Sequence, residues 1–495
     1  MTGRHDNILD PLFESAMERP ESDDPQSLGR EMGRFFRNAA AETEESLSGQ
    51  ERGEDTSRLL CKAADRALGS MHDVLDAGDR SVAWVAAGGY GRGFLSPYSR
   101  LNVLVLLDGN ASRETRQNVS EQVQSIVRAG FPSARIRLAS PSGAPEEVWQ
   151  DPLAAFDLLE TRLVAGSEEL HEAFKKTLDG EFFVPRWGSF CKELIQESLD
   201  RADPFTSSPL CTEPNLKEGR GALRDIGMMQ KLAPRLTSIP GVRELGSVLS
   251  TEDGILLSPD ENDFLNQAFD FLLRARNELH FVCGERHDTL DRALQPEVAA
   301  NLGYEGGEAE RAQALMQELF VHTSRIHGIM QAFRERFDYL RTTAWQRPQS
   351  RERRAIGSSF AVVEDTLYNS SRPPFQRGET AHRMMQCFKL SQRHHVPISQ
   401  QLLNEIQDSL DVVDEDKLWD RDTARLFLDL LDGSVGVAKR LRWMRDCGLL
   451  EKYIPEFGDV IHRVEYGESL EYTLDEHVLN AMDIIDGLAH SDREE

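Results

Sequence analysis

The chain has 495 residues, of which 57 are basic and 84 acidic, so its formal charge is −27. A chain of this length can form several domains with substantial cores, but this acidic balance excludes a general nucleic-acid binder, which needs a basic footprint. It leaves open a nucleotide pocket made by a few local arginines.

Nothing in the sequence suggests export or membrane insertion. No apolar run reaches the ~18 residues that a membrane span needs. The N-terminus lacks the basic-then-apolar order of a signal peptide, and the six cysteines are scattered without a CxxC pair. We therefore expect a cytoplasmic protein with reduced thiols and without a membrane partner.

The first 55 residues are acidic and polar, and we expect an N-terminal segment of helix and linker there. The apolar spacing over residues 28–43 predicts a short amphipathic helix. A second helix is predicted over residues 57–75, where it leads into the first buried strand.

A glycine-rich turn between two apolar runs follows. Val82–Ala87 and Leu101–Leu107 are continuous and apolar, which predicts two buried strands. Between them stands the sequence GGYGRG, residues 88–93. Glycines allow close approach of the backbone to a ligand, successive free N–H groups can bind an anion, and Arg92 suits a phosphate. The alternative is a plain tight turn, and the spacing matches neither a P-loop nor a dinucleotide fingerprint.

A helix over residues 114–129 and a half-buried strand over residues 134–139 complete a predicted core of residues 56–160. Arg135 and Arg137 lie on the polar side of that strand, facing either a triphosphate or solvent. From about residue 150 the pattern becomes helical. We expect helical domains over residues 161–345 and 346–450, and a separate C-terminal piece over residues 451–495.

Two long motifs, about 120 residues apart in the chain, carry a resemblance to a known family. GGYGRGFLSPYSRLNVLVLL, residues 88–107, resembles the nucleotidyltransferase signature of the bacterial PII uridylyltransferase/uridylyl-removing enzyme family. EPNLKEGRGALRDI, residues 213–226, is similar to a second block of that family. Weaker similarity extends to residues 158–166 and 472–477, so the resemblance covers most of the chain from about residue 55.

The resemblance implies an α+β fold, with a small mixed-sheet nucleotidyltransferase core followed by a large all-α region. In that family UMP passes from UTP to a tyrosine of the signalling protein PII, with Mg²⁺, in nitrogen regulation. The resemblance therefore implies a PII-type partner and UTP or another nucleotide as ligand. By the same resemblance, the phosphate-binding residues would be Gly88, Gly89, Arg92, Lys217 and Arg224.

One departure from the family concerns the metal site. The two metal-binding aspartates of the family fall on Arg100 and Asn102. Mg²⁺ prefers carboxylate oxygens, and two such ions assist nucleotidyl transfer. Asn102 is neutral, and a cation at Arg100 would repel an ion about 4 Å away by roughly 4 kcal/mol per unit charge at an effective dielectric near 20. We therefore expect no metal ligand and no catalytic residue at these positions.

Three functional interpretations stay open. The first is a regulatory pseudoenzyme that binds a nucleotide or PII, with Arg100 holding phosphates without metal, or a decayed site that binds nothing. The second is an active nucleotidyltransferase whose carboxylates the sequence does not locate. The third is an interaction scaffold built on the helical half.

Two further histidines match family patterns. His280, with Arg276, Arg286 and Asp288 nearby in the sequence, resembles one such pattern, although we expect a structural histidine with satisfied hydrogen bonds. Residues 451–495 resemble the start of the family's HD phosphohydrolase domain, in which His477 matches the first metal ligand. The adjacent His-Asp pair that should follow is absent from this chain. Since one histidine cannot hold a catalytic metal, we expect no uridylyl removal.

Overall fold

The computed structural model describes most of the chain in segments separated by gaps. The described residues are 2–17, 24–46, 53–75, 82–141, 152–200, 208–237, 256–344, 353–357, 359–363, 365–370, 375, 380–413, 415–432, 436–464 and 470–491. They divide into two compact units, which we treat separately. The first unit comprises Met1–Arg201, Phe269–Leu290 and Glu297–Glu305, and the second comprises Ala202–Ala268, Asp291–Pro296 and Gly306–Glu495. The five sequence segments expected above stay a prediction.

A four-stranded mixed sheet forms the centre of the first unit. Its strands, in the order β3-β2-β1-β4, are β1 (Val82–Ala86), β2 (Asn102–Leu107), β3 (Arg135–Ala139) and β4 (Arg162–Gly166). β2 and β3 are parallel, whereas β1 is antiparallel to both of its neighbours. The strand β4 contradicts the helical pattern expected from residue 150, because its five residues are fixed by pairing with β1 rather than by a local period.

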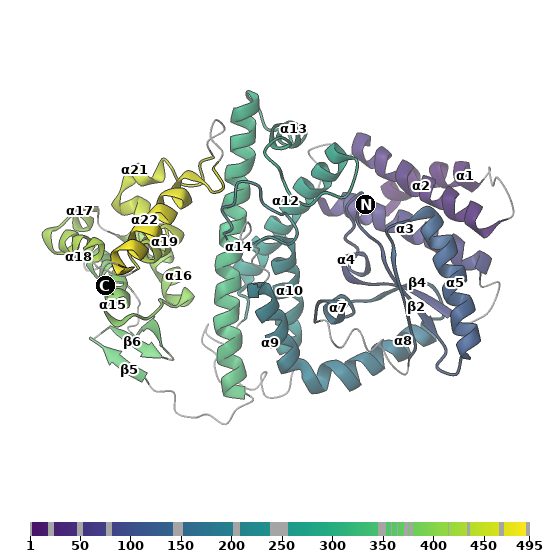
Figure 1. Cartoon of the computed structure of the whole chain (residues 1–495), viewed down its shortest axis with the longest axis horizontal. Coiled ribbons are helices and arrows are strands. Elements are labelled where there is room, and N and C mark those ends of the chain that lie inside the picture. Colours follow the sequence, from purple (N-terminus) through teal and green to yellow (C-terminus); the bar gives the residue numbers. More distant parts are fainter. Residues whose placement is uncertain are drawn as a thin grey trace. The chain divides into compact units, whose positions relative to one another are not determined.

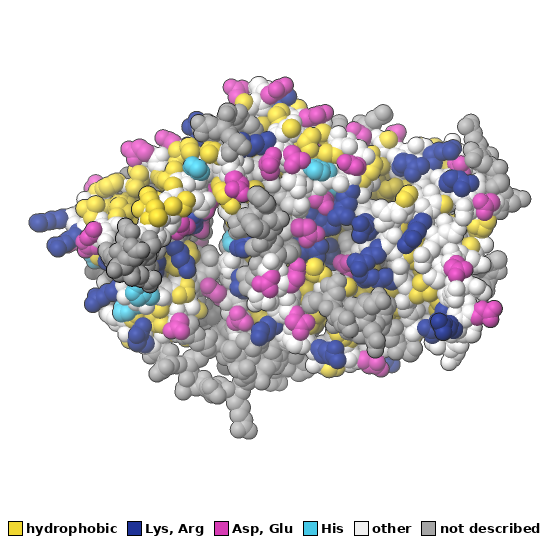
Figure 2. Space-filling view, viewed as in Figure 1, with side chains coloured by type: hydrophobic (Ala, Val, Ile, Leu, Met, Phe, Trp, Pro, Cys, Tyr) yellow, Lys and Arg dark blue, Asp and Glu magenta, His cyan; other side chains and the backbone are white. Residues whose placement is uncertain are grey.

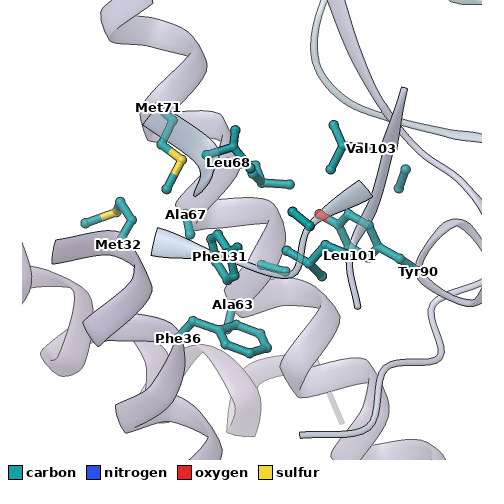
Figure 3. Close-up of a cluster of buried hydrophobic side chains, with 14 of the residues drawn as sticks. Met32, Phe36, Ala63, Ala67, Leu68, Met71, Tyr90, Leu101, Val103 and Phe131 are labelled. Carbon is teal, nitrogen blue, oxygen red and sulfur yellow. The ribbon is translucent and has the colours of Figure 1, made fainter. Parts of the chain in front are cut away.

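Three helices bury one face of this sheet. They are α2 (Pro25–Ser46), α3 (Gly53–Leu75) and α5 (Arg113–Gly130), with α1 (Thr2–Met17) packed against α2. Their apolar side chains form one core with alternate residues of β1 and β2 (Figure 3). The helices expected over residues 28–43, 57–75 and 114–129 are therefore confirmed, each slightly longer than predicted. Burial of the first two shows that the N-terminal region completes the core of this unit.

The opposite face of the sheet is covered by helices that follow β4 in the chain. α8 (Glu168–Thr177) packs against β1 and β2. It continues through a π-helical turn, η1 (Leu178–Phe183), into α9 (Val184–Asp200), which contacts α7 (Pro152–Asp157). The C-terminal part of α12 (Pro259–Cys283) also belongs to the first unit.

The second unit is mainly helical. Its long central element is α14 (Glu308–Ala344), which packs against α10 (Leu223–Thr237) and α16 (Gln400–Asp408) (Figure 1). The other helices are α15 (Thr380–His394), η4 (Leu410–Val412), α17 (Glu415–Leu418), α18 (Arg421–Leu431), α19 (Val437–Asp446), α20 (Leu449–Tyr453), α21 (Pro455–Gly458) and α22 (Leu474–Ser491), while α13 (Gln295–Asn301) crosses the boundary between the units.

A second sheet interrupts the region expected to be helical from residue 346. β5 (Arg353–Ile356), β6 (Phe360–Val363) and β7 (Thr366–Asn369) form an antiparallel meander, whose apolar residues join the core of the helices that follow. Each strand has only four residues, too few to show a period in the sequence. The fold class is nevertheless as predicted: α+β, with a small mixed sheet and a large helical part. Among the described helices, none has the length and hydropathy of a bilayer span.

Candidate functional site

The glycine-rich segment between β1 and β2 forms one turn of helix rather than the open turn expected. α4 spans Gly88–Gly91. The N–H of Gly91 donates to the Ala87 carbonyl at 3.2 Å, and that of Arg92 donates to the Gly88 carbonyl at 3.1 Å. Since Gly93 and Phe94 also donate within this turn, the N–H groups of residues 91–93 are not free in the anion-binding turn predicted over residues 88–93. Sequence reasoning missed this because consecutive glycines are poor helix formers.

Two side chains meet against the start of α4. The side-chain amide of Asn102 donates to Asp157 Oδ2 at 3.3 Å. Gly88 lies against both: a Cβ added there would be 2.8 Å from Asp157 Oδ1 and 3.0 Å from Asn102 Nδ2. The backbone of Gly88 has a φ of +61°, which also favours glycine. The structure therefore brings together Gly88, Asn102 and Asp157, three residues from α4, β2 and α7.

A partly buried network of hydrogen bonds also holds α4 in place. Tyr90 Oη donates to Asp65 Oδ1 of α3 at 2.6 Å. Arg162 of β4 binds the same carboxylate with two hydrogen bonds of 2.7 and 2.9 Å. Burial and the neighbouring Asp65 carboxylate raise the pKa of the Tyr90 phenol well above its usual value, so Tyr90 stays neutral and serves as a donor. We assign these three residues a structural role.

Cationic side chains occupy the strand ends near Asn102. Arg100 is exposed and lies two residues before the start of β2, and the described residues give it no ion pair. On the neighbouring parallel strand, Arg135 is the register partner of Asn102 and is also exposed. Figure 2 shows Lys and Arg side chains gathered on the face of the first unit around α4. Exposed positive charges therefore lie at this end of the sheet.

The loop that carries Arg100 is attached to α12. Arg276 Nη1 donates to Ser96 Oγ at 2.7 Å and Nη2 to Ser99 Oγ at 3.3 Å, while Nε donates to Asp288 Oδ1 at 2.7 Å. His280 Nδ1 accepts from the Tyr98 N–H at 3.3 Å, and its Nε2 lies 3.1 Å from Asp288 Oδ1. The expectation of a satisfied structural histidine is confirmed. Burial lowers the pKa of His280 to about 4, against the hydrogen bond to Asp288, which raises it.

The second glycine-rich block, residues 213–226, lies in the second unit and largely satisfies its own polar groups. Asn215 Oδ1 accepts from the N–H groups of Lys217 and Glu218 at 3.1 and 2.7 Å. The guanidinium of Arg224 forms a bidentate ion pair with Glu218, and Lys217 Nζ lies 3.8 Å from the same carboxylate. Both cations expected to bind a nucleotide thus face an acidic side chain within the block.

The residues at the β2 end do not fit a divalent metal pair. Asp157 is the carboxylate that the structure places beside Asn102. The neutral side-chain amide of Asn102 donates an N–H hydrogen bond to this carboxylate. Arg100 adds positive charge at the start of the same strand. No group of three or more His, Cys, Asp or Glu with metal-binding geometry occurs among the described residues. A carboxylate, an amide and a guanidinium thus stand near the start of β2, where Mg²⁺ prefers several carboxylate oxygens.

His477 lies on α22 in the second unit and is exposed. Its acidic neighbours on that helix are already paired. Arg445 of α19 binds Asp475 and Glu476 at 3.1 and 2.5 Å, and Arg442 binds Glu476 at 2.9 Å. These ion pairs join α19 to α22, so in the described residues this segment has a structural role.

Asp157 and Asp65 are the residues of this site that sequence reasoning missed. Asp157 directly precedes the segment LLETRLVAG, residues 158–166, that carried part of the family resemblance. That position was the available signal, but its contact with Asn102 spans 55 residues of chain. Asp65 lies inside α3, where a charge on an amphipathic helix gives no sign of a buried partner.

Comparison with known proteins gives a consistent result. A family model described as GlnD PII-uridylyltransferase matches residues 189–334, and one described as uridylyltransferase GlnD third domain matches residues 360–453. Curated relatives include bifunctional uridylyltransferase/uridylyl-removing enzymes of Caulobacter vibrioides (25% identical, covering 97% of this chain) and Methylococcus capsulatus (29% identical, covering 85%). These matches cover 52% and 46% of the relatives, so the chain spans about half of their length.

Proposed function

The chain belongs to the bacterial PII uridylyltransferase/uridylyl-removing enzyme family, and from this premise we propose that it is a regulatory pseudoenzyme that binds a nucleotide without transferring it. The ligand is UTP or a related nucleoside triphosphate. The protein partner is a PII-type signalling protein. Binding of the nucleotide controls whether the chain binds or releases this partner.

The observation that carries this proposal is the chemistry at the start of β2. The two metal positions of the family hold a guanidinium and an amide, Arg100 and Asn102, and the amide donates to Asp157. A guanidinium suits phosphate oxygens directly. Arg100 and Arg135, both exposed at neighbouring strand ends, can therefore neutralise part of a triphosphate in place of magnesium.

Asp157 favours a second candidate function. A carboxylate beside Gly88 and Asn102 is what an active nucleotidyltransferase with relocated metal ligands would need. A single carboxylate leaves most of a magnesium coordination sphere to water and substrate, which is why we rank this candidate second.

Binding and labelling assays separate the two candidates. We expect calorimetry to show UTP binding of similar affinity in EDTA and in Mg²⁺, and radiolabelled UTP to leave a PII-type protein unlabelled at saturating Mg²⁺. Mg²⁺-dependent labelling would overturn the proposal in favour of the second candidate. Absence of binding to UTP, ATP and a PII-type protein would refute both candidate functions. The interpretation as an interaction scaffold built on the helical half would then remain.

Reversion of the metal positions sharpens this test. In Arg100→Asp/Asn102→Asp, two new carboxylates would join Asp157 and make a group of three. We expect this variant to gain a Mg²⁺-dependent rise in melting temperature that the wild type lacks. Adding Asp157→Asn as a matched control should reduce that gain, since it removes one of the three ligands. Transfer of UMP by the double variant would show that only the metal site was lost.

A further inference from the structure

The attachment of the loop before β2 to a distant helix suggests a role for three residues that the proposed function does not use. Arg276 and His280 lie on α12 and Asp288 follows it, about 180 residues after the loop that they contact. The side chains of Arg276, His280 and Asp288 are 7%, 0% and 8% exposed. We propose that these residues, which we call the Arg276 triad, are positioning residues that fix the loop Ser96–Arg100 and thereby the place of Arg100.

The Arg276 guanidinium connects the triad to serine side chains of the loop. Asp288 accepts a hydrogen bond from Nε of this guanidinium. The two terminal nitrogens then donate to the hydroxyls of Ser96 and Ser99. The same two serines close the loop on itself, since the Ser99 N–H donates to the Ser96 carbonyl at 2.9 Å and the Ser96 N–H donates to Ser99 Oγ at 3.2 Å. Arg276 therefore binds both ends of the turn that leads to Arg100.

His280 connects the triad to the loop by its backbone. Because Nδ1 accepts the Tyr98 N–H, the proton of a neutral ring lies on Nε2, which donates it to Asp288 Oδ1. Asp288 thus orients both Arg276 and His280 with the same oxygen, while its Oδ2 accepts from Arg286 at 3.3 Å. Loss of Asp288 would therefore remove the carboxylate that orients both Arg276 and His280.

The chemistry of the triad favours positioning over general stabilisation. A buried ion pair is often no more stabilising than apolar side chains of the same volume, whereas its directed hydrogen bonds fix one geometry. The apolar attachment of the loop is supplied separately, by the edge-to-face contact of Phe94 with Phe269, whose ring centroids are 4.7 Å apart. The hydrogen bonds of the triad fix the orientation of the loop, which this apolar contact alone does not. Arg100 is the first exposed cation after the turn that they fix.

This inference deepens the proposed function and rests on it for its consequence, the binding of a nucleotide. Its structural part is tested separately, by hydrogen exchange of the loop amides in the full chain. We expect Arg276→Gln to speed exchange over residues 96–100 by about tenfold or more, because the turn opens locally. We expect the Kd for UTP to rise by about tenfold, as for loss of one charged hydrogen bond.

A matched control is Arg336→Gln in the second unit. Arg336 also forms a bidentate ion pair, with Glu261 at 2.7 and 3.0 Å, and its other hydrogen bond in the described part of the chain goes to the Leu256 carbonyl. We expect this variant to leave both the loop exchange and the Kd for UTP within about twofold of wild type.

A histidine pair keeps the test decisive if Arg276→Gln fails to fold. Asparagine places its side-chain oxygen near the position of Nδ1, so His280→Asn should keep the Tyr98 amide protected while His280→Ala exposes it. Unchanged exchange over residues 96–100 in folded Arg276→Gln, or equal exchange in the two histidine variants, would overturn the inference. Faster exchange in a protein whose wild type binds no nucleotide would refute the proposed function and support the positioning of the loop.

Discussion

The chain contains two glycine-rich blocks with arginines, and the structure distinguishes them. In the block of residues 213–226 the cation Arg224 is held by Glu218, six residues earlier. In the block of residues 88–102, Arg276 and His280 form hydrogen bonds with the loop before β2. Arg100 itself is exposed and has no ion pair among the described residues. The two blocks therefore differ in whether an acidic side chain pairs with the arginine.

The glycines of the two blocks also differ in what surrounds them. A Cβ at Gly221 would lie 2.0 Å from the Thr323 carbonyl oxygen, whereas a Cβ at Gly93 would meet nothing within 4 Å. Both residues have positive φ, at +69° and +83°. The second block is thus pressed against α14, while the glycine after α4 faces open space.

The largest expected effect on stability comes from replacing these two glycines by alanine. Gly221→Ala should lower the free energy of unfolding of the second unit by about 3 kcal/mol or more, because it adds a backbone clash to the cost of positive φ. Gly93→Ala should cost only about 1 kcal/mol, the cost of the left-handed conformation. Calorimetry of both variants checks this. Equal losses would contradict the different environments of the two glycines.

A histidine near each block should make stability depend on pH: His280 is fully buried and His327 is half-buried. Burial lowers the pKa of His280 and of His327 to about 4. His280 faces Arg276, Asp288 and Arg286; His327 faces Asp225, Arg220 and Arg334. The unfolded chain binds these protons near pH 6.5 and the folded chain only near pH 4, so stability falls as the pH falls through this window.

Each of these two histidines should contribute a loss of about 3 kcal/mol between pH 7 and pH 4. Urea unfolding at a series of pH values measures the loss, and His280→Gln and His327→Gln should each remove a part of it. A wild-type stability that stays constant over this range would show that neither histidine is neutral in the folded chain.

A smaller effect concerns affinity rather than stability. Arg100→Ala should raise the Kd for UTP by about tenfold or more, the equivalent of one charged hydrogen bond, while the melting temperature stays close to that of wild type because the side chain is exposed. Calorimetric titration measures the affinity. An unchanged Kd would remove Arg100 from the nucleotide site.

The smallest effect is expected for the paired arginine. Arg224→Gln should change the Kd for UTP by less than about twofold and the free energy of unfolding by about 1 kcal/mol, since the lost ion pair is partly exposed. The same titration, with Arg100→Ala run beside it, checks this. A tenfold loss of affinity would instead restore the family-based expectation that Arg224 contacts the nucleotide.

The sequence predicted the long helices, and it shows by itself which residues stand at the metal positions of the family. The helices over residues 28–43, 57–75 and 114–129 have enough turns to show an apolar face, and Arg100 and Asn102 stand inside a long motif. The four- and five-residue strands β4 to β7 were missed, because pairing with distant neighbours determines them.

The partners within the site were also out of reach of sequence patterns. Asp157 meets Asn102 across 55 residues, and Arg276 meets Ser96 across 180 residues. Neither spacing follows from a helical or strand period. The helix formed by Gly88–Gly91 was missed for another reason, since its short length and glycine content oppose helix formation in isolation.

The central claim, that cations replace a metal pair at the start of β2, is tested most directly by a crystal structure grown with UTP and Mn²⁺. We expect triphosphate oxygens to contact the guanidinium of Arg100, and the anomalous signal to show no manganese bound by protein oxygens beside Asn102. Two manganese ions bridged by Asp157 and other protein oxygens in that place would contradict the account.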